Sequence, residues 1–269
     1  MAIAGTFISG GAGQILVVTH EPDRPASRAV LVVPAFAEEM NKSRRLVWET
    51  ARALCEQGFR TIVPDLYGTG DSEGEFADAT WDTWIADLCR TVAWARNGGT
   101  ERFDALLVRF GAALFSAAEQ ELGTVFERAV AWQPIHRGSE VLRQLLRMKS
   151  MAIRMSGGRV ASLEALEQAL VEGPDTMELG GYEVAPKLAV AVRQATFPMR
   201  GDGSGAIGEG LILEFASPTA AMDSPPSAAD GDGIWRVRQI AAERFWNVVE
   251  PKCSPALVDA TASFLSETP

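Results

Sequence analysis

Short apolar runs that alternate with amphipathic segments constrain the fold of this chain more than any other feature. The mostly apolar runs, typical of strands buried on both faces of a parallel sheet, stand at residues 28–36, 60–64, 104–108 and 128–134. Segments with apolar side chains at helical spacing stand at residues 41–59, 80–97 and 110–122. Strands that alternate with helices form βαβ units. The sequence therefore predicts an α/β fold, with a mostly parallel sheet of about eight strands and helices on both faces.

The N-terminal residues are predicted to form an antiparallel hairpin at one edge of this sheet. Residues 5–9 and 14–20 are strand-like, and Gly-Gly-Ala-Gly joins them. Two later strands are predicted at residues 211–216 and 234–240, and a closing helix at residues 254–268. These elements extend the sheet and complete the domain.

The middle of the chain departs from the strand and helix alternation. Residues from about 135 to 180 are predicted to form a small helical cap, inserted into a single domain that spans residues 1–269. Residues 180–195 are predicted to form a further helix. Residues 217–233 contain few large apolar groups and are predicted to be mobile.

Composition argues against several classes of partner. The net charge is −10, and binding to nucleic acid or to an anionic membrane surface needs clustered basic side chains, so neither is expected. No apolar run approaches the roughly 20 residues of a membrane span, and the first residues lack the basic region of a signal peptide. We therefore expect a cytoplasmic protein. Cys55, Cys89 and Cys253 match no metal-binding spacing, and neither a metal nor a cofactor is expected.

Three stretches stand in the order and at the spacing of a known set of landmarks. Residues 31–39 (LVVPAFAEE) run from a strand into a loop, and residues 65–74 (DLYGTGDSEG) form a glycine-rich turn. Residues 106–112 (LLVRFGA) run from a strand into a helix. Together they resemble the oxyanion loop, the D-x-x-G-x-G-x-S turn and the nucleophile elbow of the α/β-hydrolase superfamily. The resemblance covers nearly the whole chain and implies that fold.

A narrower resemblance rests on shorter strings. They are Val33–Leu46, Trp132–Pro134, Gly180–Leu188 and Phe245–Trp246. These strings are similar to a bacterial group described as exosortase A system-associated hydrolase 2. The resemblance implies a cytoplasmic hydrolase-fold protein, of the ester or thioester class, that acts in or beside exopolysaccharide production. Because fold does not fix function, the residues of the site need separate consideration.

The elbow lacks its usual nucleophile. A hydrolase elbow reads G-x-S-x-G, and its three fixed places hold Leu107, Arg109 and Gly111 in this chain. A guanidinium stays protonated at any working pH, so Arg109 cannot be the nucleophile. Two interpretations of Arg109 stay open. It forms an ion pair with Glu38 or Glu39, or it forms an anion site with the N-terminus of the helix that follows it.

The histidine of a Ser-acid-His triad is also missing from its usual place after the last strand. Glu214 in a late strand, or Asp223 after it, could serve as the acid, but no histidine follows residue 241. The chain has 2 histidines. His20 is predicted to be a surface residue at the end of a strand. His136 follows a strand at the sheet edge where α/β sites lie, and is predicted either to act in catalysis or to lie exposed in the cap loop.

Two functional hypotheses follow. In the first, the chain is a hydrolase with a non-standard catalytic site built from Glu38, Glu39, Arg109 and His136, in which a glutamate acts as a general base on water. In the second, it is a catalytically inactive binder of an anionic metabolite or a partner protein. A substrate would be small and either anionic or acyl-type. The residues predicted to contact it are Phe36, Ala37, Asn41, Phe110, Trp132, Gln133 and Tyr182. Asn41 is alternatively the cap of its helix.

Overall fold

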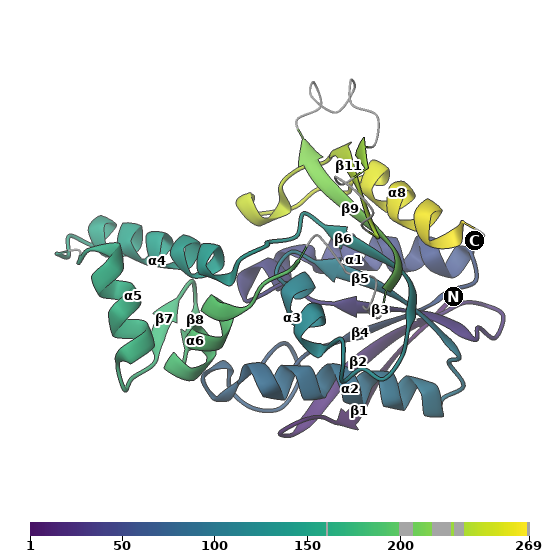
Figure 1. Cartoon of the computed structure of the whole chain (residues 1–269), viewed down its shortest axis with the longest axis horizontal. Helices are drawn as coiled ribbons and strands as arrows, with labels where there is room; N and C mark the ends of the chain where they lie inside the picture. Colours follow the sequence, from purple (N-terminus) through teal and green to yellow (C-terminus); the bar gives the residue numbers. More distant parts are fainter. Residues whose placement is uncertain (160, 199–206, 217–226, 229–233, 268–269) are drawn as a thin grey trace.

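The central sheet of the computed structural model has the strand order β1-β2-β4-β3-β5-β6-β9-β11-β10 (Figure 1). Its strands are β1 (Ala2–Ser9), β2 (Gln14–Glu21), β3 (Arg28–Val33), β4 (Arg60–Pro64), β5 (Arg102–Val108), β6 (Phe126–Trp132), β9 (Ile207–Ala216), β10 (Ser227–Ala228) and β11 (Trp235–Ala241). All neighbours from β4 to β11 in this order pair in parallel, whereas β1, β2 and β10 pair antiparallel. The predicted sheet of about eight mostly parallel strands is therefore confirmed, with the short β10 as an addition.

The structure describes residues 1–159, 161–198, 207–216, 227–228 and 234–267. The segment predicted to be mobile, residues 217–233, lies outside the described residues except for Ser227 and Ala228. Asp223, one of the two candidate acids, also lies outside them.

Helices cover both faces of the sheet, as the sequence predicts. α1 (Glu38–Glu56) and α8 (Pro255–Ser266) pack on one face, and α2 (Trp81–Asn97) and α3 (Gly111–Ala118) pack on the other (Figure 1). Successive residues of β3 enter the two hydrophobic clusters in turn, because side chains alternate along a strand. None of the helices in the described part of the chain is both long enough and apolar enough to cross a membrane.

The start of α1 differs from the prediction. Asn41 was expected to cap this helix, but α1 already begins at Glu38, and its N-cap is Ala37, which makes no side-chain cap bond. The prediction failed because Glu38 and Glu39 also suit the first turn, where the partial positive charge of a helix N-terminus favours carboxylates. As a result both glutamates belong to the helix and not to the loop before it.

The elements between β6 and β9 extend beyond one end of the sheet (Figure 1). They are α4 (Gly138–Met155), α5 (Leu163–Glu172), β7 (Met177–Leu179), β8 (Tyr182–Val184) and α6 (Pro186–Gln194). The predicted helix at residues 180–195 is too long. Gly180 and Gly181 have φ angles of 62° and 89° and turn the chain between β7 and β8, so only its second half is helical.

His20 is buried, not at the surface as predicted. Its exposed fraction is 4%, because β1 and β4 flank β2 on both sides and α1 packs over it. The sequence showed a strand that ends near His20, but it did not show that this strand lies inside the sheet. Burial lowers the pKa of His20 below its ordinary value of 6.5.

This burial predicts a loss of stability below pH 6.5. The unfolded chain binds a proton at His20 below that pH, whereas the folded chain keeps the imidazole neutral until its lowered pKa is reached. The stability that the neutral imidazole gives the folded chain is fully present above pH 6.5. It is lost as the pH falls from 6.5 to the lowered pKa of His20, by at most about 1.4 kcal/mol per pH unit. Urea unfolding between pH 7.5 and 5.5 should show a smaller slope for His20→Phe than for the wild type. Equal slopes would contradict the prediction.

Candidate functional site

Three strained residues mark the carboxyl edge of the sheet. Ala37, Arg109 and Gln133 have φ angles of 51°, 54° and 39°, and no other non-glycine residue in the described ranges has a positive φ. They follow β3, β5 and β6, which are neighbours in the sheet. Left-handed backbone at a residue with a side chain is unfavourable and tends to cluster at functional sites. The candidate site is therefore placed at this edge.

Hydrogen bonds and an aromatic ring fix the guanidinium of Arg109 at the elbow. Its Nε and Nη2 atoms donate to the carboxylate of Glu39 at 3.0 and 3.3 Å, and Nη1 donates to the carbonyl of Gln133 at 2.8 Å. The guanidinium carbon lies 3.7 Å from the centre of the Trp246 ring, from the 3-10 helix η2 (Phe245–Asn247). The side chain is only 7% exposed. The forked pair with Glu39 neutralises its charge.

The two glutamates of α1 differ in what they contact. Glu39 pairs with Arg109 and is 18% exposed, whereas Glu38 is exposed and accepts a hydrogen bond from Asn41 at 3.2 Å. Asn41 also donates to the hydroxyl of Tyr182 at 2.8 Å. Asn41 and Tyr182 therefore join α1 to β8. Burial raises the pKa of Tyr182, so its hydroxyl stays protonated at neutral pH.

A polar cavity of about 310 Å³ opens beside Arg109. Its polar lining residues are Arg109, Gln133, His136, Glu140, Gln144 and Glu214. A smaller and more apolar cavity of about 60 Å³ lies next to it, and both are lined by Ile135 and Gln144. Phe36, Phe110, Glu38, Glu39 and Trp246 line the smaller one. Together the two cavities form a cleft between the sheet edge and α4.

His136 enters the polar cavity in a defined orientation. Its Nδ1 lies 3.2 Å from the carbonyl oxygen of Phe197, and its ring stacks on the Phe197 ring at 5.8 Å. A carbonyl oxygen can only accept, so Nδ1 is the donor, and in the neutral ring with this tautomer Nε2 has the lone pair. His136 is partly exposed. A catalytic role for it stays a prediction.

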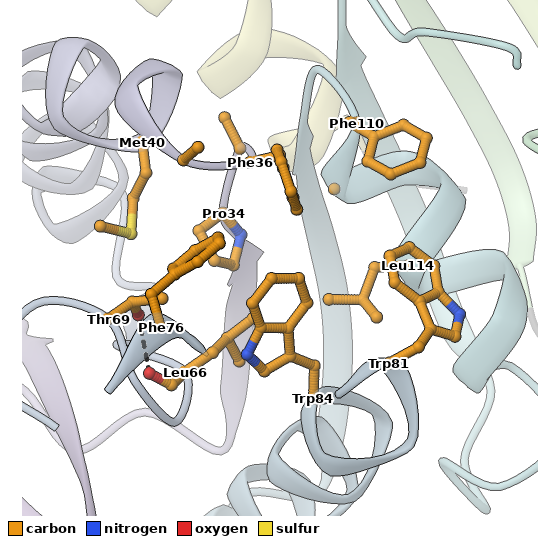
Figure 2. A pocket seen from close by; sticks show the side chains of 13 residues that line it. Pro34, Phe36, Met40, Leu66, Thr69, Phe76, Trp81, Trp84, Phe110 and Leu114 are labelled. Carbon is orange, nitrogen blue, oxygen red and sulfur yellow. Dashed lines mark hydrogen bonds between the residues drawn. The ribbon is translucent and has the colours of Figure 1, made fainter. Parts of the chain in front are cut away.

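Phe36 and Phe110 belong to an aromatic cluster that nearly fills its own cavity (Figure 2). Their ring centres are 6.1 Å apart, and Phe76, Trp81 and Trp84 complete the cluster. The remaining space is about 20 Å³. One water needs about 10–15 Å³, so this cluster is packing and not a ligand pocket.

Two other predicted contact residues have structural partners. Trp132 is fully buried, lines neither cavity of the cleft, and donates from Nε1 to Thr261 of α8 at 2.9 Å. Gln133 lines the polar cavity, while its side-chain oxygen accepts from the backbone N–H of Phe215 at 2.6 Å. Trp132 therefore belongs to the core and Gln133 to the site.

The structure adds residues that the sequence did not single out. Trp246 stacks on Arg109, Phe197 orients His136, and Glu140 and Gln144 of α4 line the polar cavity. In the sequence, Trp246 stands out only as half of the string Phe245–Trp246, which assigns it no role. In the described ranges, no group of three or more His, Cys, Asp or Glu side chains is placed to hold a metal ion.

Known proteins with this architecture include several hydrolases. Neither a protein-family model nor a curated protein sequence matches the chain. Est1E from Butyrivibrio proteoclasticus, with ferulic acid bound, is 14% identical, covers 97% of each chain and has a TM-score of 0.67. Epoxide hydrolase A from Mycobacterium thermoresistibile is 13% identical, covers 98% of each chain and has a TM-score of 0.54.

A third solved structure is XC6422 from Xanthomonas campestris, described as an α/β serine hydrolase without a lid. It is 15% identical over 91% of this chain and 87% of that chain, with a TM-score of 0.51. At such low identity these likenesses concern the fold and not the activity. Their TM-scores lie above 0.5 over most of both chains, so they share the overall arrangement of strands and helices with this chain. The chain therefore has the α/β-hydrolase fold.

Proposed function

We propose that this chain binds a small acyl-type ligand in the cleft between the sheet edge and α4, without forming a covalent intermediate at the elbow. The observation that carries the proposal is the position of Arg109. Its side chain occupies the place of the nucleophile, and its donors are used by Glu39 and Gln133. The strain at the sheet edge and the adjoining cavity support a binding role for the same edge.

The charges of the cleft favour an uncharged acyl group over an anion. Glu39 neutralises Arg109, and the carboxylates of Glu140 and Glu214 line the polar cavity. Among the described residues neither Glu140 nor Glu214 has an ion pair. An anionic ligand would therefore meet repulsion. An ester or thioester carbonyl can accept from the amides of Gln133 and Gln144, while its apolar chain lies in the smaller cavity.

Gln144 is the residue whose loss should weaken this binding most specifically. It lines both cavities, so Gln144→Leu removes an amide donor from the middle of the cleft. The Kd for S-butyryl-N-acetylcysteamine, measured by ligand-detected NMR, should rise about tenfold, as expected for the loss of one hydrogen bond in a buried site. The matched control is Gln168→Leu, on the exposed side of α5. Equal affinity of both variants, or no saturable binding by the wild type, would refute the proposal.

Hydrolysis by an activated water is a second candidate function, favoured by the tautomer of His136. Its Nε2 lone pair can take a proton from a water that attacks the bound carbonyl carbon, and can return that proton to the leaving alcohol or thiol. Slow turnover of the same thioester that is abolished in His136→Phe, with ligand binding retained, would support it. If the thioester binds but is not turned over, hydrolysis is excluded and only the binding function remains.

We also infer a cytoplasmic role beside exopolysaccharide production, with α4 to α6 as a cap over the cleft. The resemblance of Val33–Leu46 and Gly180–Leu188 to the exosortase-associated group supports the first part. The position of α4 against the smaller cavity supports the second. Deletion of the gene should lower the amount of exported polysaccharide. Unchanged export would contradict this role without touching the binding proposal.

A further inference from the structure

A further cavity, of about 240 Å³, lies on the sheet face that α1 covers. Its walls are mainly apolar and include Val18 of β2, Val63 of β4, Val32 of β3, and Met40 and Val47 of α1. Trp48 lines it as well and is 43% exposed. This cavity, here called the α1 cavity, shares no lining residue with either cavity of the cleft. It is therefore a separate place on the molecule.

The α1 cavity is lined by a buried histidine that has a ring nitrogen without a hydrogen-bond partner. His20 lines it, is 4% exposed, and has no hydrogen-bond partner at Nδ1 among the described residues. Thr61 stands directly opposite His20 in the β2–β4 pair, and its buried hydroxyl also lacks a partner. Directly opposite residues point to the same face of a sheet. Two of the three such atoms in the described part of the chain therefore belong to neighbouring residues on the same face of the sheet.

Unpartnered buried polar atoms are costly, and they are rare in folded proteins. A buried imidazole beside an apolar cavity therefore offers a hydrogen bond to whatever enters. The charged residues that line the cavity carry no net charge. Its two charged residues, Arg44 and Asp65, pair with each other at 3.0 Å. The lowered pKa of His20 keeps its imidazole neutral as well.

We propose that the α1 cavity binds a small uncharged molecule with an apolar body and one hydroxyl group, which hydrogen-bonds to the imidazole of His20. The size is suitable, since a cavity of about 150 Å³ is enough for benzene. At 240 Å³ the α1 cavity has room for an aromatic ring with a substituent. This site is independent of the cleft and of the function proposed for it.

Phenol and toluene are the probes that test the proposal, because they differ only in the group offered to His20. Phenol should bind the wild type saturably and more tightly than toluene, and should shift the ring nitrogen signals of His20 in the NMR spectrum. His20→Phe should weaken phenol about tenfold, as expected for one lost hydrogen bond, and leave toluene unchanged. His136→Phe, at the other histidine, should change neither affinity.

Val47→Trp provides a second test from the helix side, in case His20→Phe does not fold. The larger side chain fills the cavity and should abolish binding of both probes, while far-ultraviolet circular dichroism confirms that the variant is folded. Three results would each overturn the proposal. They are a lack of saturable phenol binding by the wild type, equal affinity for phenol and toluene, and retained binding in folded Val47→Trp.

Discussion

Replacing Glu39 with alanine lowers the free energy of unfolding by about 3 kcal/mol. Arg109 is 7% exposed and cannot lose its proton, so removal of Glu39 leaves a buried charge without its partner. The estimate takes the lower end of the range for buried pairs because Glu39 keeps 18% of its side chain exposed. Urea denaturation at pH 7, followed by circular dichroism, measures the change.

Glu38→Ala is the matched control for this prediction. Glu38 precedes Glu39 in the same first turn of α1, but it is exposed and pairs with no cation in the described part of the chain. Its removal should change the free energy of unfolding by less than about 0.5 kcal/mol. A double variant that makes both partners apolar, Glu39→Leu with Arg109→Met, should recover most of the loss, because no buried charge remains. Equal effects of Glu38→Ala and Glu39→Ala would show that Arg109 does not depend on this pair.

Gly111→Ala is the second substitution with a large expected effect. A Cβ atom at this position would lie 2.4 Å from the carbonyl oxygen of Pro34 and 2.5 Å from that of Val33. Both are backbone atoms at the end of β3 and cannot rotate away, so α3 must shift from the sheet. We expect a loss of about 3 kcal/mol in the free energy of unfolding, at the upper end for overpacking.

Gly98→Ala is the control for the glycine prediction. Its added Cβ would lie 3.3 Å from its nearest neighbour, the carbonyl oxygen of Ala95, and its φ angle is −82°. Alanine needs only a small shift of this carbonyl oxygen and no positive φ, so the free energy of unfolding should change by less than about 1 kcal/mol. If Gly111→Ala were as stable as Gly98→Ala, Gly111 could not lie as close to the carbonyl oxygens of Val33 and Pro34 as it does in the structure.

Much of the fold could be predicted because it depends on local patterns. Continuous apolar runs identify β3, β5 and β6 as strands covered on both faces, and the LLVRFGA string identifies the elbow after β5. The ends of α1 and α6 were less predictable. Asn41 and Gly180 each fit more than one local structure, and packing of distant segments decides between them.

The candidate site could be predicted only in part, because its contacts join distant parts of the chain. From the sequence, an ion pair of Arg109 with Glu38 or Glu39 is one of two interpretations, and the start of α1 decides which carboxylate reaches it. Trp132 follows Val130 on the same side of β6, yet nothing in the sequence shows that α8 covers that side. Trp246 and Phe197 reach the site from segments with no chemical signature.

Glu39 and Gln133 hold Arg109 at the elbow of this hydrolase fold, and we propose that the elbow performs no serine chemistry. Intact-mass spectrometry after treatment with a fluorophosphonate probe tests it most directly, on the wild type and on Arg109→Ser. No histidine follows residue 136, so even a serine at the elbow would lack the triad's base. We predict no adduct on either protein and no esterase turnover by Arg109→Ser. A stoichiometric serine adduct on the wild type, or turnover by the variant, would contradict this account.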